Sequence, residues 1–326
     1  MSDRAVRISQ PGGPEVLTIE SVEVGDPGPG EIRIRHAACG LNYIDIYPRS
    51  GVYPLPLPTG LGMEGAGIVE AVGEGVTHLK PGDRAAYASQ PIGAYATARV
   101  MPARCVVKLP DFLSFEQGAS MMLKGMTVQY LLQRTLPQGG LQAGDHVLFH
   151  AAAGGVGLIA MQWAKTLGVT VIGTVGSEEK AELARAHGCD HVILYKQENI
   201  VERVRELTNG RMVPVVYDSV GKDTFSASLD CLQPYGLMVS FGNASGPVPP
   251  VALTALKGTL YLTRPSLVPH VANRKNLEEM AADLFKQVSS GKVKIRIDQR
   301  HPMADAAQAH RDLEGRKTTG QTVLLP

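Results

Sequence analysis

The chain has 326 residues, of which 44% are hydrophobic and 19% charged, and its formal net charge is +1. This length and composition suit a globular protein with one large domain or two smaller ones. The nearly balanced charge, with no long run of Lys or Arg, argues against a surface for nucleic acid or anionic membrane.

The cysteines and the N-terminus indicate the compartment. Four cysteines are widely spaced and form no CxxC pair, which argues against a zinc lobe and a disulfide framework; they are Cys39, Cys105, Cys189 and Cys231. The segment MSDRAVRISQPGG lacks the apolar core of a signal peptide, and no stretch reaches the roughly 18 apolar residues of a membrane span. We therefore expect a cytoplasmic protein without membrane or nucleic-acid partners.

The first 110 residues predict a compact β domain. Short apolar runs, EIRIRHAA, GAGIVEAVG and CVVKLP, alternate with turn signals such as Pro81-Gly82-Asp83. From about residue 115 the pattern changes to a helical period in FEQGASMMLKGMTVQYLLQR.

A regular alternation of strands and helices follows. HVLFHA is predicted as a strand, and GVGLIAMQWAKTLG as a helix that ends at Gly168 in a left-handed cap. The segments that continue the alternation are TVIGTV, SEEKAELARAHG, HVILY, IVERVRELTNG, VPVVYDSV, a short helix near Phe225 to Cys231, and GLMVSFGN. Apolar strands between amphipathic helices need crossover connections, which predicts a doubly wound parallel sheet.

The last sixty residues predict a smaller set of elements. We expect a helix around Leu277 to Val288, a strand at KVKIRI, a helix around Ala304 to Leu313 and a final strand at TVLLP. A terminal strand of this kind could return to the first domain.

The turn between the strand HVLFHA and its helix is rich in glycine. It aligns as Ala152-x-Gly154-x-x-Gly157, a dinucleotide fingerprint with alanine at the first position. Gly154 would let the backbone approach a pyrophosphate, and Gly157 would let the helix pack closely on the sheet. The simpler alternative is a structural turn, but the strand–helix units that follow favour a dinucleotide site.

The end of the next strand indicates which dinucleotide. An NAD site usually has an acidic residue there, whereas this chain has Gly176 and Ser177. Ser177 and Lys180 can donate to a 2′-phosphate, which favours NADPH. Glu178 and Glu179 oppose this reading, and Lys180 could alternatively be a solvated helix residue.

Several segments resemble one family over nearly the whole chain. AAAGGVGL, GTVGSEEK, VVYDSVG, MVSFGNASG and LYLTRPSL resemble the zinc-independent quinone oxidoreductases, the ζ-crystallin-like group of the medium-chain dehydrogenase/reductase superfamily. The stretch from CGLNYIDIYPRSG to KPGDRA resembles that family's GroES-like catalytic domain. The resemblance implies an α/β fold, with a GroES-like domain at 1–124 and 268–326 and a Rossmann dinucleotide-binding domain at 125–267.

The resemblance also implies residue roles and a homodimer with the cofactor in a cleft between its domains. Lys180, Tyr195 and Arg316 match positions that hold the adenosine 2′-phosphate, and Gly154 and Gly157 match the glycine turn. The positions that match residues lining the nicotinamide, its ribose or the diphosphate are Asn42, Thr127, Gly155, Val156, Ser219, Phe241, Gly242 and Asn243.

The zinc motif of related dehydrogenases is altered in this chain. Zinc-dependent relatives have Gly-His-Glu-x-x-Gly, whereas this chain has Met63 in place of the His. A thioether is a poor zinc ligand, so no metal is expected. His146 with His150, and the segment HGCDH at 187–191, have ligand-like composition but suit a strand and a helix cap better. Glu64 is interpreted as structural or as a polar group near the cleft.

Without a Lewis acid the substrate must accept hydride readily, as quinones do. Asn42 is the first choice for orienting the nicotinamide ribose or the substrate, with Tyr47, Tyr53 and Thr127 as further catalytic candidates. Asp45 could be a proton relay or a turn residue. The leading hypothesis is NADPH:quinone reduction; the alternatives are an enone or alkenal reductase, an NADPH-binding regulatory protein and, last, a zinc alcohol dehydrogenase.

Overall fold

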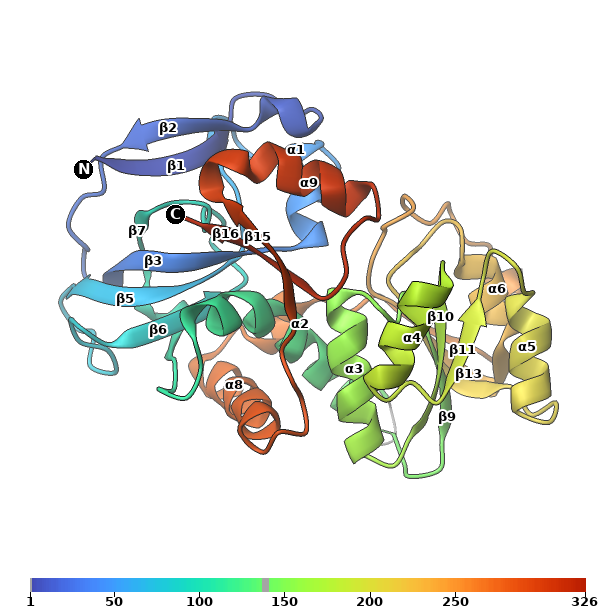
Figure 1. Cartoon of the computed structure of the whole chain (residues 1–326). Helices are drawn as coiled ribbons and strands as arrows, with labels where there is room; N and C mark the ends of the chain where they lie inside the picture. The colour runs from blue at the N-terminus through green and yellow to red at the C-terminus, as the bar shows by residue number, and fades with distance from the viewer. Residues whose placement is uncertain (1, 137–140) are drawn as a thin grey trace. The chain divides into compact units, whose positions relative to one another are not determined.

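The computed structural model describes residues 2–136 and 141–326, which form two compact units. The first unit comprises Met1–Met126, Leu267–Ser289 and Ile295–Pro326. The second unit comprises Thr127–Ser266 and Ser290–Lys294. Each unit is described by itself (Figure 1).

A six-stranded sheet forms the second unit. Its strand order is β11-β10-β9-β12-β13-β14, and every pair is parallel. The strands are β9 (His146–Phe149), β10 (Thr170–Val175), β11 (His191–Leu194), β12 (Val213–Asp218), β13 (Leu232–Ser240) and β14 (Tyr261–Thr263). Counted from β9, the order is 3-2-1-4-5-6, the doubly wound dinucleotide-binding arrangement. The predicted parallel sheet is confirmed.

The core of this unit follows one row across the sheet. Ile172, Leu148, Val216 and Met238 are paired neighbours on four adjacent strands, and all four are fully buried. Helices cover the sheet: α3 (Gly155–Thr166), α4 (Glu178–Ala186), α5 (Ile200–Leu207), α6 (Phe225–Asp230) and the short 3-10 helix η4 (Leu253–Ala255). Figure 1 shows α3 next to α4. Gly168 after α3 has φ +72°, which confirms the predicted left-handed cap.

The first unit contains two β-sheets. The smaller sheet has the order β2-β1-β4, and the larger one β15-β16-β3-β5-β6-β8, with β7 also paired to β3. The strands are β1 (Asp3–Ile8), β2 (Thr18–Val22), β3 (Glu31–Leu41), β4 (Thr59–Gly60), β5 (Glu64–Val72), β6 (Arg84–Ala88), β7 (Ala98–Pro102), β8 (Val106–Lys108), β15 (Ile297–Pro302) and β16 (Gln321–Leu325). Alternate residues of β3, such as Ile32 and Ile34, are fully buried, as expected for a sheet with one face on the core.

Helices and short 3-10 turns complete the first unit. The α-helices are α1 (Ile46–Arg49), α2 (Phe115–Gln133), whose last residues belong to the second unit, α7 (Leu267–His270), α8 (Arg274–Ser289) and α9 (Ala306–Glu314). The 3-10 turns are η1 (Pro14–Val16), η2 (Tyr43–Asp45), η3 (Ala103–Cys105) and η5 (Met303–Asp305). The terminal strand β16 pairs antiparallel with β3, with Val323 opposite Gly40. The C-terminal segment therefore does return to the sheet of the first domain.

One predicted strand is wrong in position. KVKIRI occupies 292–297, but β15 begins only at Ile297 and runs to Pro302. The side-chain amide of Gln162 on α3 accepts the backbone N–H of Lys294 at 2.8 Å and donates to its carbonyl at 3.2 Å. The backbone of Lys294 is therefore not available for a sheet ladder. The alternating pattern of KVKIRI reflects the burial of Val293 in the second unit and does not indicate a strand.

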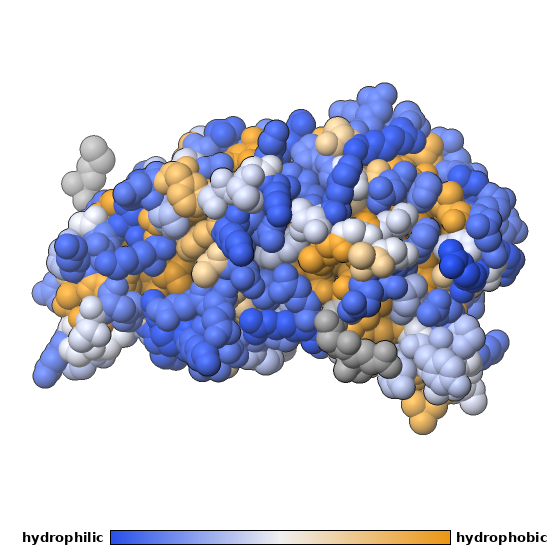
Figure 2. Space-filling model, turned by 90° about the horizontal axis from the view of Figure 1, so that it is seen from below, coloured by the Kyte–Doolittle hydropathy of each residue, from blue (hydrophilic) through white to orange (hydrophobic). Residues whose placement is uncertain are grey.

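The surface is mixed in character. Figure 2 shows one face on which hydrophilic side chains predominate and hydrophobic ones form patches between them. None of the helices within the described ranges is both long enough and apolar enough to span a bilayer.

Candidate functional site

The glycine turn connects the central strand β9 to α3. Gly154 is the N-cap of α3, and it has no side chain to accept from the first N–H groups of the helix. A Cβ on Gly157 would lie 2.4 Å from the carbonyl oxygen of Ala152, so only glycine fits there. Ala151 takes the left-handed conformation, with φ 57°, whereas Ala152 does not. Alanine is thus compatible with the first position of the motif, and no side chain caps the start of the helix, the end that favours an anion.

Most of the candidate residues of the second unit lie at the carboxyl ends of its strands. Gly154–Gly157 follow β9, Gly176 and Ser177 follow β10, and Tyr195 follows β11. Ser219 follows β12, and Phe241, Gly242 and Asn243 follow β13. Because all these strands are parallel, the structure brings these residues to one edge of the sheet. This is the edge where ligands bind in open α/β sheets.

The residues after β10 and β11 are in close contact. A Cβ on Gly176 would lie 2.7 Å from the hydroxyl oxygen of Tyr195, so the tyrosine tip rests on this glycine. Ser177 caps α4, and its hydroxyl accepts the backbone N–H of Lys180 at 3.4 Å. The structure therefore places Gly176, Ser177, Lys180 and Tyr195 together at the start of α4.

The loops after β12 and β13 are held by Asp218 and by each other. One carboxylate oxygen of Asp218 accepts the N–H groups of Val220 and Gly221 at 2.7 Å and 3.0 Å. A Cβ on Gly242 would lie 2.3 Å from the carbonyl oxygen of Ser219, so the two loops touch at a position where only glycine fits. Asn243 donates to the carbonyl of Gly242 at 2.9 Å and accepts from Arg264 at 3.1 Å.

A buried polar cluster surrounds Asn42 in the first unit. The Nδ2 of Asn42 donates to Glu64 at 2.8 Å, and its backbone N–H donates to Asp45 at 2.9 Å. Tyr95 donates its hydroxyl to the same oxygen of Asp45 at 2.8 Å. The ammonium of Lys124 donates to the carbonyl of Leu41 at 3.2 Å.

Burial dominates the electrostatics of this cluster. It raises the pKa of Asp45 to about 7, although the hydrogen bonds from Tyr95 and Asn42 oppose the shift. Burial also raises the pKa of Glu64 and lowers that of Lys124, while the attraction between these two groups acts against both shifts. Asp45 is thus a carboxyl group that can change its charge near neutral pH.

The remaining catalytic candidates, and Arg316 from the cofactor-binding set, lie in separate parts of the chain. The ring centroid of Tyr47 is 5.0 Å from that of Tyr53 and 5.9 Å from that of Tyr43, so the three tyrosines form one aromatic cluster in the first unit. Thr127 is buried on α2 in the second unit. Arg316 follows α9 in the first unit, in the left-handed region with φ 57°.

Comparisons with known proteins identify the family. Residues 28–111 match the alcohol dehydrogenase GroES-like domain, and residues 155–287 match the zinc-binding dehydrogenase family. A quinone oxidoreductase of Pseudomonas aeruginosa is 55% identical over 326 residues, 99% of each chain. The chain belongs to the quinone oxidoreductase family of medium-chain dehydrogenases/reductases.

Two further relatives bear on the chemistry of this quinone oxidoreductase family member. The crystal structure of Escherichia coli quinone oxidoreductase complexed with NADPH matches with a TM-score of 0.97 and 49% identity, over 99% of this chain and 100% of that one. A 2-haloacrylate reductase of a Burkholderia species is 45% identical, over 99% of this chain and 98% of its own.

The side chain that ligates zinc in the wider superfamily is replaced in this chain by that of Met63. Met63, which stands in the place of the zinc-ligating histidine, is buried directly before β5, and Glu64, the first residue of that strand, accepts a hydrogen bond from Asn42. In 2–136 and 141–326, no three His, Cys, Asp or Glu side chains gather as metal ligands would.

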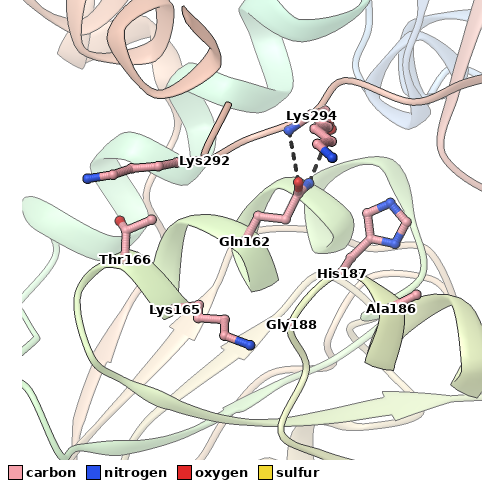
Figure 3. Close-up of a pocket in the computed structure, with 8 residues that line it drawn as sticks. All are labelled: Gln162, Lys165, Thr166, Ala186, His187, Gly188, Lys292 and Lys294. Atoms are coloured by element: carbon pink, nitrogen blue, oxygen red, sulfur yellow. Dashed lines mark hydrogen bonds between the residues drawn. The ribbon is translucent and has the colours of Figure 1, made fainter. Parts of the chain in front are cut away.

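A pocket of ≈ 340 Å³ in the second unit lies away from the glycine turn. Gln162, Lys165 and Thr166 line it from the last turns of α3, and His187 and Gly188 from the end of α4. Figure 3 shows Gln162 holding the backbone of Lys294 at its rim. Of the lysines that line the pocket, Lys165 lies in the last turn of α3, where it offsets the partial negative charge of the last carbonyls of that helix.

The sequence-based interpretation missed one residue that organises the site, Asp218, and left Glu64 open between a structural role and a polar group near the cleft. Asp218 holds the loop after β12, and its position at the end of an apolar strand was a signal that could have found it. Glu64 contacts Asn42 across 22 positions of the chain, and nothing in the local pattern of either residue indicates that contact.

Proposed function

We propose that this chain reduces quinones with NADPH and without a catalytic metal. The observation that carries the proposal is the glycine turn at the carboxyl end of β9, where Gly157 has no room for a Cβ and α3 begins without a side-chain cap. The NADPH complex of the E. coli relative supports the choice of cofactor. The methionine at position 63 supports the metal-free chemistry.

The second unit is proposed as the dinucleotide-binding domain and the first unit as the GroES-like catalytic domain. In the second unit, the backbone of Gly154, Gly155, Val156 and Gly157 would hold the pyrophosphate. Gly176, Ser177, Lys180 and Tyr195 would hold the 2′-phosphate, and we assign Arg316 of the first unit to the same group. Thr127, Ser219, Phe241, Gly242 and Asn243 are assigned to the nicotinamide, its ribose or the diphosphate.

In the first unit, Asn42, Tyr47 and Tyr53 are proposed to orient the reacting groups. When bound, NADPH supplies the hydride. Tyr53 is exposed and packs edge-on against the buried Tyr47, so its ring would be held in place to stack on a flat substrate ring. Asn42 is held rigid by Glu64 and by the turn that Asp45 caps, so it meets the ligand without reorganisation.

A second candidate function is the reduction of a conjugated carbon–carbon double bond, which the 2-haloacrylate reductase relative favours. Purified protein should be mixed with NADPH and either 1,4-benzoquinone or a simple enone, while NADPH absorbance is followed. The proposal predicts faster oxidation of NADPH with quinones. Faster oxidation with enones across a series of both acceptors would reverse the order of the two functions.

The chain is further proposed to form a homodimer in the cytoplasm. The strand β14 lies at the edge of its sheet, and Tyr261 and Leu262 on it are about half exposed. A two-fold axis through this edge would pair two copies of β14 antiparallel and bury these side chains. All four cysteines are free thiols, which suits a reducing compartment.

A further inference from the structure

The side-chain amide of Asn42 is engaged at one end only. Its Nδ2 donates to Oε2 of Glu64 at 2.8 Å and lies 3.4 Å from the carbonyl oxygen of Gly40. Its Oδ1 is buried and has no hydrogen-bond partner within 2–136 and 141–326. An acceptor buried without a partner is costly, so its persistence at this position points to a ligand that satisfies it.

Hydrogen bonding and burial hold the Glu64 carboxylate in place, and this determines how the side-chain amide of Asn42 is oriented. Its Oε1 accepts the backbone N–H of Leu123 on α2 at 2.8 Å, and its side chain is fully buried. A Cβ at Gly40 would lie 2.5 Å from Oε2, so the carboxylate fills the space next to this glycine. Because a carboxylate only accepts hydrogen bonds, Asn42 must turn its NH₂ towards Glu64 and its oxygen away from it.

We propose that Glu64 is a positioning residue that makes Asn42 a hydrogen-bond acceptor for the bound ligand. The inference rests on the proposed function, and it decides which of the two ligands Asn42 meets. An oxidised quinone has only acceptor oxygens, whereas the nicotinamide riboside half of NADPH carries hydroxyl and carboxamide donors. Asn42 therefore binds the cofactor, and the quinone oxygen takes its hydrogen bond from another donor.

The first test is a double-mutant cycle on NADPH affinity, measured by calorimetry without quinone. In Glu64→Gln the single side-chain oxygen remains with the N–H of Leu123, and the new NH₂ faces Asn42 and favours the reversed amide. We expect the Kd for NADPH to rise about 3- to 10-fold, the loss of one hydrogen bond. In an Asn42→Ala background the same substitution should change the Kd by less than about twofold, because its target is gone.

Equal effects of Glu64→Gln in both backgrounds would overturn the proposal, since a purely structural role of Glu64 does not depend on Asn42. Glu70→Gln is the matched control: Glu70 lies on the same strand, pairs with Arg33 and Arg35, and should leave the Kd unchanged. If the parent chain binds no NADPH, the proposed function fails. If it binds NADPH but the cycle is additive, only this inference fails.

Asn42→Ala alone gives a second test that leaves the Glu64–Lys124 pair in place, in case Glu64→Gln does not fold. We expect the Kd for NADPH to rise about 3- to 10-fold and the KM for benzoquinone to change by less than about twofold. A KM for quinone that rises several-fold, with the Kd for NADPH unchanged, would show that Asn42 meets the substrate and would overturn the proposal.

Discussion

Lys180 lies in the first turn of α4, next to the cap Ser177. Its ammonium can bind the 2′-phosphate that distinguishes NADPH from NADH. We expect Lys180→Ala to weaken NADPH binding by about 1–3 kcal/mol, the contribution of a charge-assisted contact, and NADH binding much less. Fluorescence titration with both cofactors measures this. Lys165→Ala, at the far end of α3, is the control, and equal weakening of both cofactors would remove the assignment.

Gly157 is the glycine of the turn with the least room for a side chain. A Cβ there would meet the carbonyl oxygens of Ala152 and Ala151 at 2.4 Å and 2.5 Å, so the start of α3 must move. We expect Gly157→Ala to lower the free energy of unfolding by about 1–3 kcal/mol and to abolish tight NADPH binding. Urea unfolding and calorimetry measure these effects. Gly25→Ala, where a Cβ meets nothing within 4 Å, should change neither.

A buried histidine in the larger sheet of the first unit links β3 to β6 through its side chain. His36 on β3 donates from Nδ1 to the carbonyl of Ala96 at 2.7 Å and accepts at Nε2 from the Tyr87 hydroxyl on β6 at 2.8 Å. Burial lowers the pKa of His36 from 6.5 to about 4. Below about pH 6.5 the unfolded chain therefore takes up a proton that the folded chain refuses, and stability falls as the pH falls towards 4.

Replacement of this histidine should reduce that pH dependence. Between about pH 7 and pH 5, His36 should account for a loss of about 2 kcal/mol in the free energy of unfolding. In His36→Gln this part of the pH-dependent loss in the free energy of unfolding should disappear, although we expect the variant to be less stable than the parent at both pH values. Urea unfolding at the two pH values measures it. An unchanged difference between them would contradict the buried, neutral state of His36.

The alternating elements were predictable because they follow local patterns. Apolar strands such as TVIGTV and glycine caps such as Gly168 are encoded within a few residues, and the structure has both where the sequence predicts them. KVKIRI was misplaced because an alternating pattern shows that residues are buried but not what buries them, and here Val293 and Lys294 pack within the second unit. The partners of Asn42 come from β5 and the next turn, and a contact such as Asn42–Glu64 needs the paired strands to exist first.

Assembly of the whole molecule should depend on the exposed edge at β14. In the proposed dimer, Leu262→Lys would place a charge in an antiparallel strand pair and leave it without a partner. We expect sedimentation to show the mass of one chain for this variant and of two chains for the parent. Val52→Lys, an equally large change at another exposed apolar residue, should remain dimeric. A dimeric Leu262→Lys variant would place the interface elsewhere.

The most direct test of the account is a crystal structure of the full chain with NADPH. It should place the pyrophosphate within hydrogen-bond distance of the backbone N–H groups of Val156 and Gly157, and the 2′-phosphate beside Lys180. Asn42 should then present its side-chain oxygen to a donor on the nicotinamide half. Cofactor bound away from the start of α3, or no cofactor at concentrations that saturate its relatives, would contradict the account.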